Sequence, residues 1–205
     1  MEIAFSLLAL AASFAGGKVR AAISALILLA AASAAAAPLE ERLPTCLACH
    51  GETGQSNAPE IPSLGAQMSP YVLIQLYLFR EKQRVNEIMN QMAHDLTDAD
   101  LQTFADAIAK LPAPRSAGEP SDPAVMATGL SLVLRYRCNF CHNADLSGRD
   151  NVPRIAGQRE DFLVKTMLEY KNNTRHGYDG SMAEVLQPIS EGEIKDIAYF
   201  VSRQP

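Results

Sequence analysis

The sequence predicts an all-α protein built from two similar helical domains. Three observations support this: one motif occurs twice, the segments after each copy share a proline and a glutamine, and both halves end with the same helix-capping signals. Both copies of the motif read C-x-x-C-H, at positions 46–50 and 138–142. A chain of 205 residues has room for two domains of about 75 to 85 residues each.

The repeated motif indicates two covalently attached haem c groups. Two thiols add to one porphyrin edge, and the histidine that follows them reaches the iron. Two disulfides or a zinc site are the alternatives, but 89 residues separate Cys49 from Cys138, which is too far for paired zinc motifs. Neither alternative explains a histidine after each second cysteine. The predicted attachment residues are Cys46, Cys49, Cys138 and Cys141, and the predicted iron ligands on one face are His50 and His142.

Residues 1–36 are predicted to be a signal peptide. Lys18 and Arg20 precede an apolar run that ends in alanines, so we expect cleavage near Ala36. An uncleaved membrane anchor is the alternative, because a second apolar run lies upstream of the basic pair. Export to the periplasm agrees with the motif, since c-type haem is attached outside the cytoplasm.

The rest of the chain divides into domain 1 at 37–112, a proline-containing linker at 113–122 and domain 2 at 123–205. Nine residues separate the expected cleavage site from Cys46, which leaves domain 1 little room for an N-terminal helix.

Domain 2 does have room for such a helix. Asp122 is a suitable cap and Pro123 suits the first helical position. The apolar stripe expected for this helix consists of Val125, Leu130, Val133 and Leu134.

A proline follows each haem motif, at Pro62 and Pro153, in matching segments that also place Gln67 opposite Gln158. We expect each proline to fix its loop so that a carbonyl accepts a hydrogen bond from the haem-ligating histidine.

Arg84 and Arg175 recur at the same spacing of 91 residues. Each is interpreted as a charge partner for a haem propionate or for the neighbouring domain. A solvated arginine is the alternative.

Between these prolines and arginines, Ser69 and Pro70 predict the start of a helix over 71–82, which is mirrored at 160–171. The last helix of each half begins with a capping box, Thr97 with Asp100 and Ser190 with Glu193. Their expected buried stripes are Leu101, Phe104 and Ile108, and Ile194, Ile197 and Val201.

Methionine on the second face of each iron would raise the reduction potential and close the iron to substrates. Met89 lies seven residues before Leu96 and Met182 lies seven before Ile189, which are the residues that precede the two capping boxes. The repeat therefore predicts Met89 and Met182 as ligands. Met92 is the reserve in domain 1, and Met182 is expected in a polar loop.

The charge pattern gives no indication of a nucleic-acid binder, since the formal net charge is −5 at pH 7. Residues 37–112 contain ten acidic and five basic side chains, whereas residues 123–205 contain ten of each. This asymmetry favours docking to a basic partner, although a solvated acidic surface is the alternative.

These motifs together resemble the di-haem cytochrome c4 family from about Thr45 to Arg203. The resemblance implies two tandem class I cytochrome c domains, each wrapped around one haem, and the axial pairs His50 with Met89 and His142 with Met182. It implies a periplasmic electron carrier of the respiratory chain rather than an enzyme, with redox proteins such as a terminal oxidase as partners.

The chain departs from the family in its short N-terminus. Related di-haem chains are the cytochrome subunits of flavin-containing sulfide dehydrogenases and other periplasmic dehydrogenases, and the departure favours this alternative. We also expect any membrane contact to be peripheral if the N-terminus does not anchor the chain. The sequence contains no dinucleotide-binding fingerprint.

Overall fold

The computed structural model describes residues 38–115, 121–175 and 180–205. In these residues all the regular structure is helical, and the only β-type pairing is one isolated bridge between Arg149 and Val152. The predicted all-α class is confirmed. The predicted signal peptide and residues 116–120 of the predicted linker lie outside the described residues.

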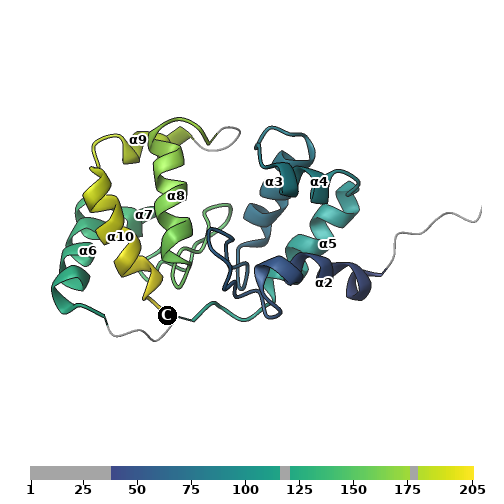
Figure 1. Cartoon of the computed structure of the whole chain (residues 1–205), viewed down its shortest axis with the longest axis horizontal. Coiled ribbons are helices and arrows are strands. Elements are labelled where there is room, and N and C mark those ends of the chain that lie inside the picture. Colours follow the sequence, from purple (N-terminus) through teal and green to yellow (C-terminus); the bar gives the residue numbers. More distant parts are fainter. Residues whose placement is uncertain (1–37, 116–120, 176–179) are drawn as a thin grey trace, which may run out of the picture. The chain divides into compact units, whose positions relative to one another are not determined.

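The described residues of the first half, 38–115, form four helices, which Figure 1 labels. Helix α3 packs against both α4 and α5, and α2 contacts α5. Val72, Ala105 and Ile108 form the buried cluster between α3 and α5. The bounds are α2 Leu39–His50, α3 Ser69–Arg80, α4 Glu87–Ala93 and α5 Asp98–Ala109.

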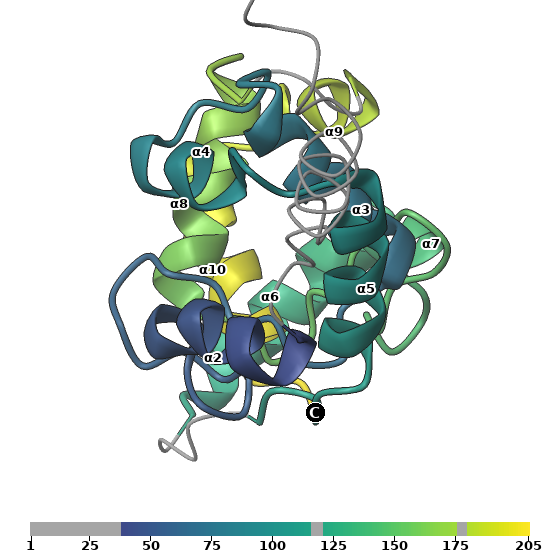
Figure 2. The same ribbon diagram turned by 90° about the vertical axis from the view of Figure 1, so that its right-hand side faces the viewer.

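The second half contains five helices, and α10 packs against both α6 and α8, as Figures 1 and 2 show. Helix α9 contacts α8. Within the described residues no helix of one half packs on a helix of the other, so loops and side chains make the contact between halves. The bounds are α6 Pro123–Arg135, α7 Cys138–Cys141, α8 Glu160–Lys171, α9 Gly180–Leu186 and α10 Glu191–Ser202.

The last helix of each half has the predicted caps and the predicted buried face. Both capping boxes are formed in full, by Thr97 with Asp100 and by Ser190 with Glu193. All six residues of the two expected stripes are buried. The predicted bounds of α8 are also confirmed, whereas α3 begins earlier, at Ser69, with Met68 as its N-cap. The Ser69 hydroxyl instead donates to Asp106 of α5 at 2.6 Å.

The expectation that the first half nearly lacks an N-terminal helix is wrong. The nine residues before Cys46 suffice for a helix, and α2 runs without a break through the haem motif to His50. In the second half Arg137 has a left-handed backbone, with φ 58°, and separates α6 from α7. The first half therefore merges into one helix the two elements that the second half keeps apart.

The predicted apolar stripe of α6 is only partly correct. Val133 is buried, but Leu130 and Leu134 are exposed, and Leu132 is buried instead. The face of α6 that meets α10 is set by Gly129, where an added Cβ would lie 2.5 Å from both the Asp196 carbonyl oxygen and the Phe200 Cβ. This close approach fixes the rotation of a helix whose leucines lie on several faces.

Candidate functional site

The two C-x-x-C-H motifs each place two thiols and an imidazole on one helical turn. The first motif ends α2, and the second forms α7 together with the residue after it. The four cysteines are free in this structure, and within the described residues no group of three or more His, Cys, Asp and Glu side chains is arranged so that it could hold a metal ion.

Both histidines are buried and hydrogen-bonded in the same way. His50 Nδ1 lies 2.8 Å from the Pro62 carbonyl oxygen, and His142 Nδ1 lies 2.8 Å from that of Pro153. A carbonyl only accepts, so Nδ1 carries the proton and Nε2 is left to bind a metal. Burial lowers the pKa of both imidazoles, against the opposing effect of these carbonyls, which favours the neutral form that a ligand needs.

The loops that hold Pro62 and Pro153 share one hydrogen-bond pattern. The Gly54 carbonyl accepts from the N–H groups of Leu64 and Gly65. The Leu146 carbonyl accepts in the same way from Ile155 and Ala156. Local backbone bonds thus bring each proline carbonyl back over its histidine.

In the second half an apolar cavity brings the predicted ligands together. It is lined by Cys138, Cys141, His142 and Met182. Met182 belongs to the short helix α9, so its expected place in a polar loop is wrong. Met167 of α8 lies on the same cavity wall and is therefore a second sulfur near this site. The thiol pair, the oriented imidazole and a methionine around an apolar space fit a covalently attached haem.

In the first half Met89 is half-buried in α4, and its N–H donates to the capping side chain of Asn86 at 3.0 Å. Met92 of the same helix is 41% exposed. This difference favours Met89 over the reserve, although the ligand assignment stays a prediction.

Arg84 and Arg175 are both partly buried and bonded to other side chains, which argues against the solvated alternative. Arg84 donates to Gln75 Oε1 at 2.6 Å, and Arg175, whose side chain is 5% exposed, pairs with Glu169 Oε2 at 3.0 Å.

Burial, together with the positive charge of Arg175, lowers the pKa of Arg84 to about 10. Burial alone would also lower the pKa of Arg175, but Tyr71, Tyr170 and Glu169 raise it above its usual value. Two partly buried cations from different halves therefore lie near each other.

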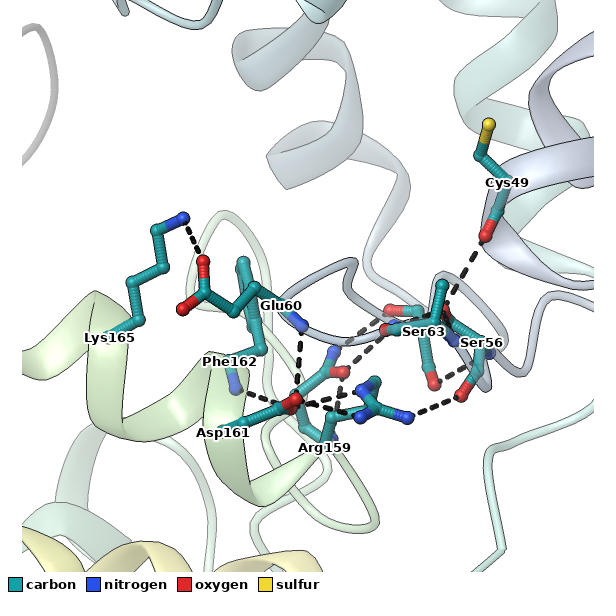
Figure 3. Close-up of polar contacts among 10 residues, drawn as sticks. Cys49, Ser56, Glu60, Ser63, Arg159, Asp161, Phe162 and Lys165 are labelled. Carbon is teal, nitrogen blue, oxygen red and sulfur yellow. Dashed lines mark hydrogen bonds and ion pairs between the residues drawn. The ribbon is translucent and has the colours of Figure 1, made fainter.

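The contact between the halves includes residues that the sequence patterns did not single out (Figure 3). Lys165 Nζ lies 2.6 Å from Glu60 Oε2, and Asp161 accepts from the Glu60 N–H at 3.0 Å. In the sequence, Gln67 and Gln158 stand out only because they occupy equivalent positions in the two halves. In the structure, each side chain forms a hydrogen bond with the backbone of the opposite half. Their recurrence at one spacing was the available signal.

No helix within the described ranges is long and apolar enough to cross a membrane.

Comparison with known proteins identifies relatives along most of the chain, although no protein-family model matches it. The chain is 31% identical to cytochrome c4 of Thiocapsa roseopersicina over 170 residues, which cover 76% of this chain and 85% of the relative. It is 31% identical to a thiosulfate dehydrogenase electron acceptor of Thiomonas intermedia strain K12, covering 90% and 89% of the two proteins. The solved cytochrome c4 of Acidithiobacillus ferrooxidans matches with a TM-score of 0.69 at 26% identity, covering 78% of this chain and 98% of that one.

Proposed function

The chain belongs to the di-haem cytochrome c4 family, and from this premise we propose which residues hold its haems and between which proteins it carries electrons. It is an electron-transfer protein with two covalently bound haem c groups rather than a catalytic enzyme, as its cytochrome relatives are. Its fold is that of two tandem cytochrome c domains, for which we propose the bounds 37–112 and 123–205.

We assign one haem to Cys46 and Cys49 and the other to Cys138 and Cys141. The axial pairs are His50 with Met89 and His142 with Met182. The observation that carries this assignment is the repeated bond from histidine Nδ1 to a proline carbonyl, at 2.8 Å in both halves. A bound haem c supplies a one-electron couple, and a methionine ligand raises its potential.

The chain's own residues orient each imidazole, keep it neutral and exclude water from the metal side. In the second half the apolar lining of the cavity performs the last task. With both axial positions filled by protein atoms there is no open site for a substrate, which agrees with a carrier rather than a peroxidase.

Arg84 and Arg175 are proposed to face the anionic edge of the haems. Burial, and after it the positive charge of Arg175, lowers the pKa of Arg84, so these two neighbouring guanidinium groups repel each other. A carboxylate between them would relieve this repulsion, and the haem propionates are the carboxylates that the cofactor supplies.

We place the protein in the periplasm, where it passes electrons from a respiratory donor to a terminal acceptor. A specific observation supports a second candidate, the electron-accepting subunit of a periplasmic dehydrogenase. The Thiomonas intermedia relative, at 31% identity, is named a thiosulfate dehydrogenase electron acceptor. In either case the partner is a redox protein. We further propose that any contact of the N-terminal segment with the membrane is peripheral.

Size-exclusion chromatography of native extract, first without detergent and then with it, tests the proposal. Haem absorbance and flavin fluorescence are followed in every fraction, and a haemochrome assay gives the haem content. A small, flavin-free species with two haems per chain in the soluble extract is expected for the free carrier. Elution in a larger complex with a dehydrogenase would support the subunit. A reduced protein that binds carbon monoxide rapidly at both haems would contradict the axial assignment.

A further inference from the structure

Two buried glutamines cross between the halves and bind the backbone there. Gln158 donates from Nε2 to the Ser63 carbonyl at 2.9 Å, and its Oε1 accepts from the Ser63 N–H at 2.8 Å. Gln67 donates to the Arg154 carbonyl at 3.0 Å and accepts from the Arg154 N–H at 2.8 Å. Each side-chain amide thus pairs with both backbone groups of one residue in the other half.

The two contacted residues directly follow the prolines that bind the histidines. The Ser63 N–H belongs to the same peptide group as the Pro62 carbonyl, which His50 uses. The Arg154 N–H belongs to the same peptide group as the Pro153 carbonyl, which His142 uses. One peptide plane therefore lies between the histidine of one half and the glutamine of the other, and the arrangement occurs twice.

Both glutamines are held in the orientation that this contact needs. Gln158 Oε1 also accepts from the Arg159 N–H at 3.0 Å, and Gln67 Oε1 accepts from the Met68 N–H at 3.1 Å. Two N–H donors converge on each oxygen, which fixes the oxygen and nitrogen positions of the amide. Gln67 and Gln158 are each 6% exposed, so water does not compete strongly for their hydrogen bonds.

A hydrogen bond donated by the N–H of a peptide group makes the carbonyl of the same group a stronger acceptor. When Gln158 Oε1 accepts a hydrogen bond from the Ser63 N–H, the Pro62 carbonyl becomes a better acceptor for the His50 Nδ1 proton. A stronger bond at Nδ1 makes the imidazole a better donor to iron, which favours the ferric state. The same reasoning applies to Gln67 and His142.

We propose that each half of the protein sets the orientation and basicity of the axial histidine in the other half, with Gln158 acting on His50 and Gln67 acting on His142. Both glutamines are positioning residues. The proposal rests on the assignment of these histidines as iron ligands. It makes the reduction potential of each haem depend on the hydrogen bonds between the halves.

The test uses the full haem-loaded chain with Gln158→Leu, which keeps the side-chain size but removes both amide groups. In redox titrations followed by haem-methyl NMR signals assigned to each half, the ferrous-to-ferric ratio of the His50 haem at a fixed potential should rise about two-fold. The His142 haem should change less. Gln67→Leu should give the reverse pattern.

A second readout reports on the bond itself. In the reduced protein the His50 Nδ1 proton signal should move upfield in Gln158→Leu, and the His142 signal should stay in place. If the leucine variant loads haem poorly, Gln158→Asn, whose shorter side chain cannot reach Ser63, replaces it.

Lys165→Ala is the matched control, because it removes the ion pair to Glu60 across the same contact and touches neither peptide. It should leave both histidine signals unchanged. The inference is overturned if each glutamine variant alters only the haem of its own half, or if the opposite histidine signal does not move in a fully loaded variant. His50→Ala should lose the low-spin spectrum of its haem. If the low-spin spectrum persists in this variant, the assignment of His50 as an iron ligand fails, and with it the proposed function.

Discussion

At the scale of single residues, the histidines, their prolines and the arginines have partners that recur from one half to the other. His50 and His142 are both tied to a proline carbonyl, and Arg84 and Arg175 are both drawn out of solvent. The methionines differ more, because Met182 has a competitor on its own cavity wall in Met167. The methionine of the second half is therefore the first ligand to test by substitution.

Met182→Ala should open the iron position of the second half. We expect the potential of that haem to fall, because methionine ligation raises it, and we expect the reduced protein to bind carbon monoxide at one haem. Loss of the sulfur-to-iron charge-transfer band for one haem, together with carbon monoxide titration, measures the change. Met167→Leu is the control in the same cavity and should keep both properties. The opposite result for the two variants would make Met167 the ligand.

At the scale of elements, the two halves differ in how the N-terminal helix meets the last helix. In the second half α6 lies closely against α10 at Gly129. In the first half α2 is tied to α5 by an ion pair between Arg42 and Asp100, with the Arg42 guanidinium 4.9 Å from the centre of the Phe104 ring. Packing dominates one junction, and charge contributes to the other.

Gly129→Ala should destabilise the second half although alanine favours helices. The new Cβ would meet backbone oxygen at 2.5 Å, so α6 and α10 must separate, at a cost of about 1 to 3 kcal/mol. Thermal unfolding followed by the helical circular dichroism signal measures this loss of stability. Gly192→Ala, in α10 with no neighbour within 4 Å, should instead be neutral or slightly stabilising. Equal effects at the two sites would refute the close-packing argument.

Asp100 should make stability depend on acid. The hydrogen bond from Arg42, followed by that from the Thr97 N–H, holds the pKa of Asp100 well below its usual value of 3.8. Because this pKa is lower in the folded state than in the unfolded state, the Asp100 carboxylate stabilises the fold at pH values above the unfolded-state pKa. This stabilisation is lost as the pH falls from the unfolded-state pKa through the folded-state pKa.

Asp100→Asn should therefore be less stable than the wild type at neutral pH, and the gap should narrow below about pH 4. Urea unfolding at a series of pH values measures the gap. Asp98→Asn, at a position whose carboxylate is 90% exposed, is the control and should track the wild type. A gap that stays constant down to the lowest pH would argue against the ion pair as its source.

At the scale of the whole molecule, charge is distributed unevenly between the halves. The range 37–112 has twice as many acidic as basic side chains, whereas 123–205 is balanced. A redox partner that docks on the first half should therefore present a basic surface. Hydrogen bonds link the halves, and among the described residues no helix of one half packs on a helix of the other.

Electron transfer to such a partner should slow as salt is added, because ions screen exposed charges over about 10 Å at 0.1 M ionic strength. Stopped-flow reduction at increasing ionic strength measures the rate. Glu60→Gln removes an exposed carboxylate that is already paired with Lys165. It should change the salt dependence of the rate less than replacement of the other exposed acidic residues of the first half as a group. A rate that does not depend on salt would remove the acidic surface from the docking argument.

The amino-acid sequence alone predicts the features that depend on local pattern. The cysteine spacing, the proline after each motif, both capping boxes and the buried stripes of α5 and α10 need only a few neighbouring residues, and their repetition raised each signal above chance. The fold class and the two haems followed from these features. The signal peptide and the ligand assignments remain predictions of the same kind.

Which helix faces meet depends on contacts between residues far apart in the sequence. The stripe of α6 was misassigned because leucines lie around much of that helix and Gly129, not hydrophobicity, selects the side that meets α10. The helix before Cys46 was missed because its tie to Asp100 spans 58 positions of sequence. Gln67 and Gln158 show the same limit most clearly: their partners lie 87 and 95 residues away, and a hydrogen bond at that separation exists only once both halves have folded and met.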